Sequence, residues 1–90
     1  MNFEGKPQID DAVRAVLRDT LSLSPERAAA LRDDTPLFGA MPELDSMAVA
    51  GLLTEIEDRL AIVIDDDEVD GDMLATFGAL TTFVAGKALL

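Results

Sequence analysis

The chain has 90 residues, of which 7 are basic and 18 acidic, so its formal net charge is -11 at pH 7. A charge of this sign repels a phosphate backbone and argues against nucleic acid as a partner. Histidine and cysteine are both absent, which excludes Ser-His-Asp triads, cysteine nucleophiles, zinc sites and disulfides. We therefore expect one small domain over residues 1–90, with its core at about 9–84 and no metal.

Hydrophobic residues make up 49% of the chain, which is enough for a core that needs neither metal nor disulfide. No run approaches the ~20 apolar residues of a membrane span. Residues 1–7 also lack the apolar centre of a signal peptide. The sequence thus predicts a soluble, cytoplasmic protein without a membrane span.

Two helices are predicted in the first third of the chain. From Pro7 onward, apolar residues recur every three or four positions, which predicts an amphipathic helix. Ser24 and Pro25 are a capping serine followed by proline at the first helical position, and they predict a short helix from Pro25 to about Leu31. Residues 32–44 contain two prolines and a glycine and are expected to form a loop. Its apolar side chains are expected to anchor it: Leu37, Phe38 and Leu44.

Two further helices and one short helix are predicted in the second half. A long apolar stripe begins at Asp45 or Ser46 and continues to Leu60, which predicts a long helix. The acidic run at 65–68 suits the N-terminal end of a short helix, because carboxylates are stabilised by the helix dipole there. Thr76 is a preferred N-cap and predicts the start of the last helix.

These elements predict an all-α bundle of three longer helices plus one or two short helices, because no strand pair is apparent. We expect this bundle to be monomeric. The in-phase apolar positions give the predicted core: Val13, Leu17, Leu52, Leu53, Ile56, Leu60, Ile64, Leu80, Phe83 and Val84. Phe38, Phe77 and Met73 are also most simply explained as core residues.

The sequence Leu44-Asp45-Ser46-Met47 places a serine hydroxyl where the long loop becomes a helix. Asp and Ser are preferred N-cap residues, so a helix cap is one interpretation of Ser46. A helix N-terminus also binds phosphate, because its first N–H groups are unpaired and the helix dipole is positive there. A phosphate group beside Ser46 would therefore be stabilised.

From Ile9 to Val84, the order of helix, long loop, Asp-Ser, helix, short helix and helix resembles an acyl carrier protein of the phosphopantetheine-binding superfamily. The resemblance implies an acyl-carrier-like bundle with a 4'-phosphopantetheine arm attached to Ser46 through a phosphodiester. It implies a carrier and not an enzyme, with an acyl or aminoacyl group held as a thioester on the arm. The resemblance also implies a phosphopantetheinyl transferase that installs the arm, and to which Asp45 would matter. Acyl- or aminoacyl-loading enzymes and downstream transferases with basic surfaces are the other implied partners.

Two residues depart from the pattern of carriers in fatty-acid synthesis. Glu43 stands where these usually have glycine, and Ala48 stands where they have an acidic residue, so the class of cargo stays open. Partner docking is expected at Met47, Gly51, Glu57 and Asp58. For Gly51 the alternative is tight packing against a helix of the same domain. For the two acidic residues the alternative is a solvated helix face.

Two other functions stay open on the sequence alone. One is a helical protein-protein interaction module without a prosthetic group. The other is a calcium-binding protein, because Asp66, Glu68, Asp70 and Gly71 have the spacing that opens a calcium loop. Phe77 occupies the position that needs a bidentate glutamate, so we do not expect an EF-hand, although weak cation binding to the acidic run at 65–72 stays open.

Overall fold

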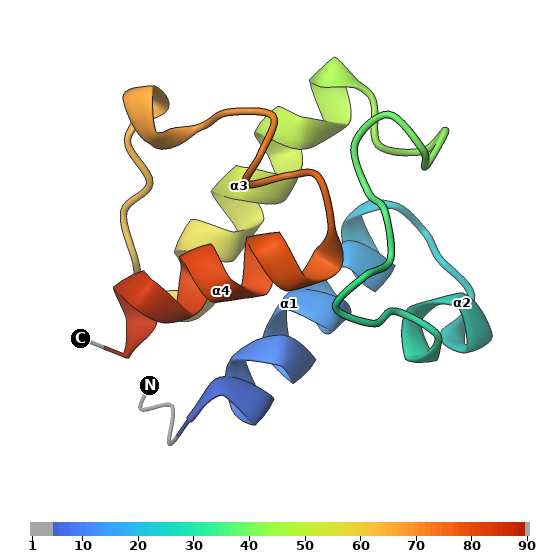
Figure 1. The fold of residues 1–90 in the computed structure, drawn as a ribbon, viewed down its shortest axis with the longest axis horizontal. Coiled ribbons are helices and arrows are strands. Elements are labelled where there is room, and N and C mark those ends of the chain that lie inside the picture. Colours follow the sequence, from blue (N-terminus) through green and yellow to red (C-terminus); the bar gives the residue numbers. More distant parts are fainter. Residues whose placement is uncertain (1–4, 90) are drawn as a thin grey trace.

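The computed structural model describes residues 5–89. Its elements are α1 (Lys6–Thr20), α2 (Pro25–Ala29), α3 (Ser46–Leu60), the 3-10 helix η1 (Asp66–Glu68) and α4 (Phe77–Ala88). Pro36 and Thr76 form an isolated bridge, and residues 5–89 contain no strand. The expected helical bundle is thus confirmed, with three longer and two short helices (Figure 1).

Helix α1 is the centre of the bundle, because it packs against α2, α3 and α4 (Figure 1). Its apolar stripe is fully buried: Ile9, Val13, Val16 and Leu17. The spacing of three and four residues places all four side chains on one face of the helix. One amphipathic helix therefore supplies the surface on which the other helices assemble.

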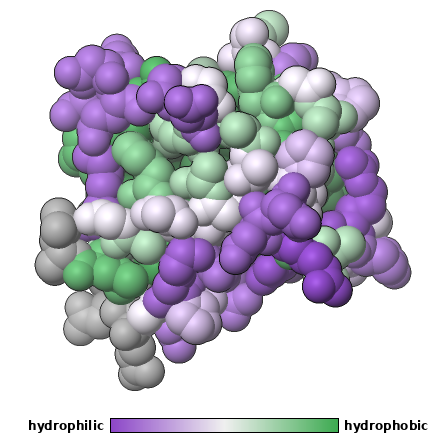
Figure 2. Space-filling view, in the orientation of Figure 1, coloured by the Kyte–Doolittle hydropathy of each residue, from purple (hydrophilic) through white to green (hydrophobic). Residues whose placement is uncertain are grey.

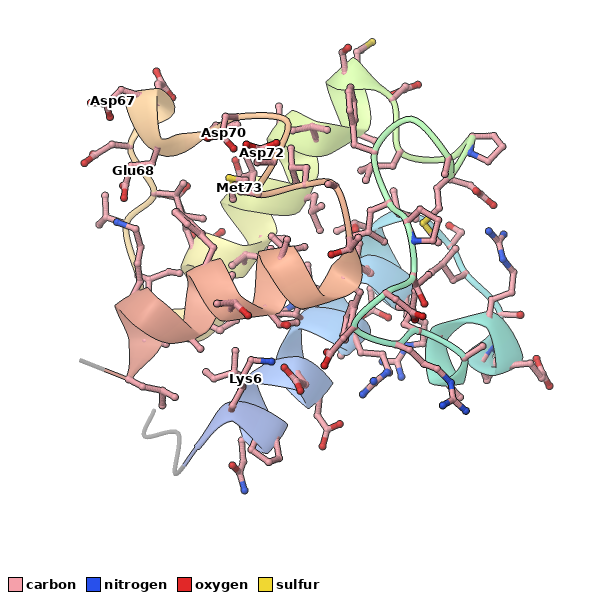
Figure 3. All side chains as sticks on the ribbon, viewed as in Figure 1. Lys6, Asp67, Glu68, Asp70, Asp72 and Met73 are labelled. Atoms are coloured by element: carbon pink, nitrogen blue, oxygen red, sulfur yellow. The ribbon has the colours of Figure 1, made fainter. Side chains whose placement is uncertain are left out.

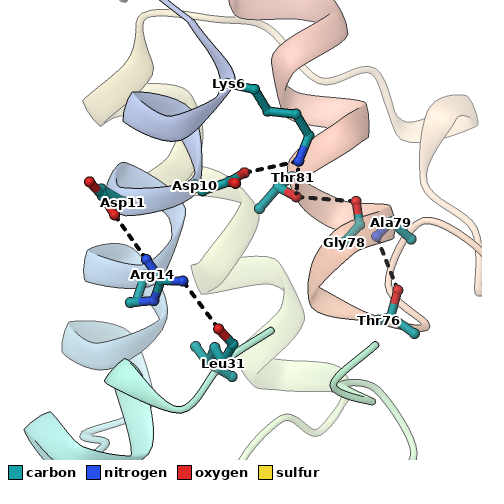
Figure 4. A network of polar contacts seen from close by, with 9 residues as sticks. All are labelled: Lys6, Asp10, Asp11, Arg14, Leu31, Thr76, Gly78, Ala79 and Thr81. Carbon is teal, nitrogen blue, oxygen red and sulfur yellow. Dashed lines mark hydrogen bonds and ion pairs between the residues drawn. The ribbon is translucent and has the colours of Figure 1, made fainter. Parts of the chain in front are cut away.

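Polar contacts join α1 to α4 at the edge of this core (Figure 4). The Lys6 ammonium donates to the Asp10 carboxylate at 3.1 Å and to the Thr81 hydroxyl at 3.2 Å. Thr81 is fully buried, and its hydroxyl donates in turn to the Gly78 carbonyl at 3.1 Å. This buried polar side chain of α4 thus has both a donor and an acceptor as partners, which removes the cost of burying it.

The chain between α3 and α4 fills the space between these helices. Ala61 ends α3 in the left-handed conformation, with φ of 55°. Beyond it, the side chains of Ile64, Met73 and Leu74 are buried in the core. The acidic 3-10 helix η1 lies on the outside of this segment (Figure 1). The segment therefore buries these three apolar side chains and exposes most of its carboxylates.

The loop that precedes α3 is tied to the start of α4 by backbone hydrogen bonds. The Leu37 and Phe38 amides donate to the carbonyls of Ala75 and Leu74 at 2.9 and 3.0 Å. The loop backbone comes close to α4 at Gly78, where an added Cβ atom would lie 2.7 Å from the backbone oxygen of Asp33. Leu37 and Leu44 are buried and anchor the loop, as expected.

Three apolar side chains are less buried than the sequence predicted. Leu53 and Phe83 are half-buried and pack against the core from its edge. Leu53 flanks the stripe whose centre is the fully buried Leu52, and the Lys87 ammonium lies 5.7 Å from the centre of the Phe83 ring. Phe38 is 43% exposed. Met73 and Phe77 are core residues, as predicted.

Candidate functional site

The candidate site is the N-terminus of α3. Asp45 is its N-cap, and the carboxylate accepts the Ala48 amide at 2.8 Å. The cap interpretation of Ser46 is therefore wrong, because the preceding residue performs that role. The amides of Ser46 and Met47 have no hydrogen-bond acceptor within residues 5–89. Both residues are exposed, Met47 by 87%, so a hydroxyl and two free N–H groups face solvent together at the positive end of the helix dipole.

The approach to α3 is held in place by its own contacts. The Met41 amide donates to the Leu37 carbonyl at 2.8 Å, and the Leu44 amide donates to the Met41 carbonyl at 3.1 Å. Arg27 of α2 forms a two-pronged ion pair with Glu43. The Arg27 guanidinium lowers the pKa of the Glu43 carboxyl below its ordinary value. Buried leucines on the inside and an ion pair on the outside thus fix the direction from which the chain enters α3.

A pocket of about 230 Å³ opens beside Ser46, with an almost wholly apolar lining. Its walls include Phe38, Ser46, Val49, Val69, Asp70 and Leu74. The Asp70 carboxylate accepts the Met73 amide at 2.8 Å, which shapes the turn at the pocket's edge (Figure 3). The pocket therefore joins the start of α3 to the loop that follows η1.

The acidic segment at 65–72 is organised by hydrogen bonds of its own. Glu68 accepts the Asp65 amide at 3.0 Å and pairs with Lys87 of α4 at 2.6 Å. The Lys87 ammonium, and then the Asp65 amide, lower the pKa of Glu68. Asp67 points outward from η1 (Figure 3). Among residues 5–89, no group of three or more acidic side chains is placed to hold a metal ion.

Negative charge dominates the surface because the few basic side chains are already paired. Within residues 5–89, every Lys and Arg except Arg32 forms an ion pair with a carboxylate. The carboxylates left over include the exposed Asp65, Asp66 and Asp67. Figure 2 shows hydrophilic residues gathered over η1, with hydrophobic residues beside them. A partner approaching this side meets uncompensated negative charge next to an apolar surface.

The expected docking residues all lie on α3, but they differ in exposure and in their hydrogen bonds. Gly51 is exposed, and an added Cβ atom would meet nothing within 4 Å, so tight packing is not its role. Asp58 is exposed. Glu57 is half-buried, and its carboxylate accepts the Ile64 amide at 2.9 Å, which fixes the turn after α3. Glu57 thus has a structural role that the sequence pattern did not reveal.

Sequence reasoning also missed the pocket and the Arg27–Glu43 ion pair. Val49 lies on the apolar stripe of α3, and nothing in its spacing distinguishes a core position from a pocket wall. Arg27 and Glu43 are 16 positions apart, joined through a loop whose course the sequence did not predict. An Arg and a Glu on either side of a loop are the only signal, and that signal is weak.

Comparison with known proteins defines the class. A family model described as a phosphopantetheine attachment site matches residues 11–84. The matched range contains the whole site, from the loop before α3 to the turn at Met73. No helix within residues 5–89 is long and apolar enough to cross a membrane.

A solved structure agrees with this class. The chain is similar to a holo acyl carrier protein from Nitrosomonas europaea, solved by solution NMR, with 42% identity and a TM-score of 0.78. The similarity covers 86% of this chain and 92% of that one. No curated protein matches the chain. The chain belongs to the phosphopantetheine-binding acyl carrier protein family.

Family membership settles the general function. The protein is a non-catalytic carrier with a 4'-phosphopantetheine prosthetic group, and it works with partner enzymes. The interaction-module alternative without a prosthetic group is thereby wrong. The site fits the group, because exposed amides at a helix N-terminus can bind a phosphodiester anion. When bound, the arm supplies the thiol that this cysteine-free chain lacks.

Proposed function

We propose that Ser46 carries the phosphopantetheine arm and that the arm holds an acyl or aminoacyl group as a thioester. The observation that carries this proposal is the pair of free amides beside the exposed Ser46 hydroxyl at the start of α3. They provide N–H donors and a positive dipole end for the phosphodiester. Asp45 supports the site by satisfying only the third amide of the helix, which leaves the first two free.

The other two serines lack this environment. Ser24 caps α2, and its hydroxyl accepts the Arg27 amide at 3.2 Å. Helix α2 has only 5 residues, so its dipole is small. Ser22 lies in a turn with φ of 55° and begins no helix. Ser46 is therefore the preferred acceptor.

Attachment requires a separate transferase. The Ser46 oxygen would form a bond to the phosphorus of coenzyme A that bears the pantetheine. The pyrophosphate bond would break, and the adenosine nucleotide would leave with the other phosphate. This chain has no histidine, and Asp45 is already engaged as a cap. The base that takes the hydroxyl proton, and the Mg²⁺ that stabilises the leaving phosphate, are accordingly assigned to a phosphopantetheinyl transferase.

Intact mass spectrometry tests the attachment. Incubation with a broad-specificity transferase and coenzyme A should add one phosphopantetheine, and peptide mapping should place it on Ser46. Ser46→Ala should accept none and remain as stable as the wild type, because Asp45 provides the cap. Ser24→Ala is the matched control and should be modified normally. Modification of Ser46→Ala at the wild-type rate would contradict the assignment.

We also propose that partner enzymes with basic surfaces dock on α3, where Met47, Gly51 and Asp58 are exposed. Asp58→Lys should slow transferase modification severalfold at low salt, and the effect should shrink as salt rises, because screening acts over about 8 Å at physiological ionic strength. Asp33→Lys changes the net charge equally but lies in an exposed loop away from α3. Equal slowing by both variants would show that only net charge matters. Glu57 is unsuitable for this test because its substitution also removes the Ile64 hydrogen bond.

We propose that residues 1–90 act as one monomeric carrier domain in the cytoplasm. The helical core that involves residues 9–84 supports a single domain. Gel filtration with light scattering checks the oligomeric state directly.

A further inference from the structure

We propose that Met47 is an oxidation site, and that its conversion to the sulfoxide by a hydroperoxide weakens docking of the phosphopantetheinyl transferase on α3. The inference rests on the proposed docking of partner enzymes on this helix. It gives the carrier a reversible control of its own modification, at the side chain that directly follows the attachment residue Ser46.

Exposure distinguishes Met47 from the other methionines that the structure describes. Met47 is 87% exposed, whereas Met73 is 6% exposed and belongs to the core. Met41 is half-buried and packs against the core. A small peroxide reaches the sulfur of an exposed thioether without any movement of the fold, so oxidation should follow the exposure of the side chain.

The oxidation is balanced by the peroxide alone. The Met47 sulfur attacks one oxygen of hydrogen peroxide, and the oxygen–oxygen bond breaks. The sulfur keeps this oxygen and is oxidised by two electrons, while the other oxygen is reduced and leaves as water with both protons. A methionine sulfoxide reductase reverses the step, with a thiol reductant as the source of the two electrons.

The position of Met47 on α3 gives the oxidation its effect. Among residues 46–60, Met47 is the one large apolar side chain that is exposed. The other exposed positions near it carry small side chains: Ala50, Gly51 and Thr54. A partner that docks here therefore buries Met47 as its largest apolar contact on this helix. The sulfoxide is polar, and burying it against an apolar partner surface without a hydrogen bond is unfavourable.

The fold itself should not respond to this oxidation. Met47 belongs neither to the buried core nor to the side chains that pack against it. The start of α3 is held independently, because the Asp45 carboxylate accepts the Ala48 amide at 2.8 Å. Oxidation thus changes the docking surface and leaves the helix that presents it in place.

Peroxide treatment of the apo protein, followed by the kinetics of its modification, tests the proposal. Catalase removes the peroxide before the transferase and coenzyme A are added. Peptide mapping should show Met47 oxidised about tenfold faster than Met73, and it reports Met1 and Met41 separately. The KM of the transferase for the oxidised protein should rise about threefold or more with kcat unchanged, because a docking contact acts equally before and during the reaction. Treatment with the reductase should restore the KM.

Two variants assign the effect to Met47. The KM for Met47→Leu should be the same before and after peroxide treatment, because leucine is apolar but has no thioether. Met41→Leu is the matched control and should respond to peroxide as the wild type does. Circular dichroism should show equal helix content in the oxidised and reduced wild-type protein.

The outcomes separate this inference from the proposed function. Untreated wild-type protein that accepts no phosphopantetheine would overturn the attachment and, with it, the effect on docking, while peptide mapping alone still decides the oxidation site. Oxidation of Met73 as fast as Met47 would overturn the site. An unchanged KM after complete oxidation of Met47, or a KM for Met47→Leu that still rises with peroxide, would overturn the effect on docking.

Discussion

The N-termini of α3 and α4 use the same capping chemistry but differ in the hydrogen bonding of their first amides. Asp45 accepts the Ala48 amide at 2.8 Å, and Thr76 accepts the Ala79 amide at 3.0 Å. In each helix a short polar side chain thus satisfies the third amide. Local sequence makes the two helix starts equivalent.

The first two amides distinguish them. In α4, the Phe77 amide donates to the Thr35 carbonyl and the Gly78 amide donates to the Asp33 carbonyl, both at 2.9 Å. In α3, the corresponding amides of Ser46 and Met47 have no acceptor within the described residues. The loop before α3 supplies acceptors to the first two amides of α4, which we call the closed terminus. The first two amides of α3 have none within residues 5–89, so we call that end the open terminus. The availability of donors, rather than the presence of a cap, therefore distinguishes a candidate phosphate site from an ordinary helix start.

Gly78→Ala should break the closed terminus, and its effect on stability should exceed that of either cap substitution. The new Cβ atom would lie 2.7 Å from the Asp33 oxygen, so the loop has to move and its bonds to α4 weaken. We expect a loss of about 1–3 kcal/mol in the free energy of unfolding, measured by urea denaturation. Gly86→Ala is the control, because it meets open space in the same helix and should stabilise by about 0.5–1 kcal/mol. Equal effects of the two substitutions would mean that the close approach does not exist in solution.

Substitution of the two caps should have a smaller effect on stability and a selective effect on function. Asp45→Ala and Thr76→Ala should each lower the free energy of unfolding by about 1 kcal/mol. Only Asp45→Ala should also slow transferase modification of the chain. Asp45→Asn keeps a good cap without the charge, so normal stability with slow modification would identify the charge as the feature that the transferase needs. A Thr76→Ala variant that is modified equally slowly would contradict the distinction between the two termini.

The smallest effect concerns the ion pair beside the open terminus. Arg27 lowers the pKa of Glu43 from its ordinary value of 4.5, so the pair stabilises the fold above that pH and its contribution is lost as the pH falls through the lowered pKa. In Arg27→Met the pKa of Glu43 should rise toward its ordinary value, which carbon-detected NMR titration measures. Arg32→Met is the control, because Arg32 has no ion-pair partner among residues 5–89. An unchanged Glu43 titration in Arg27→Met would contradict the pairing.

The helices were predictable because their signals are local. Ser24, Asp45 and Thr76 each stand directly before the helix that they start, and the stripe in α1 repeats within a single element. The degree of burial was less predictable. Leu52 and Leu53 are adjacent and equally apolar, yet only Leu52 lies at the centre of the interface, because the rotation of α3 is set by packing against α1.

The candidate site was predictable in part for the same reason. The Asp-Ser motif is local and located the start of α3 correctly. That the amides of α3 are free while those of α4 are bonded depends on the Thr35 and Asp33 carbonyls, which belong to the loop before α3 and are distant from α4 in the chain. The Glu57 contact with Ile64 depends likewise on the path of the turn after α3. Contacts of this kind have no pattern within either segment alone.

The central position of α1 has a consequence for synthesis on the ribosome. Chains emerge from the N-terminus onward, so α1 leaves the exit tunnel before α3 and α4, the two helices that cover most of its apolar stripe. Until α4 follows, α1 lacks one of the helices that pack against it in the finished molecule. The bundle closes late, and truncation anywhere before α4 would release a chain whose first helix is still exposed to chaperones and proteases.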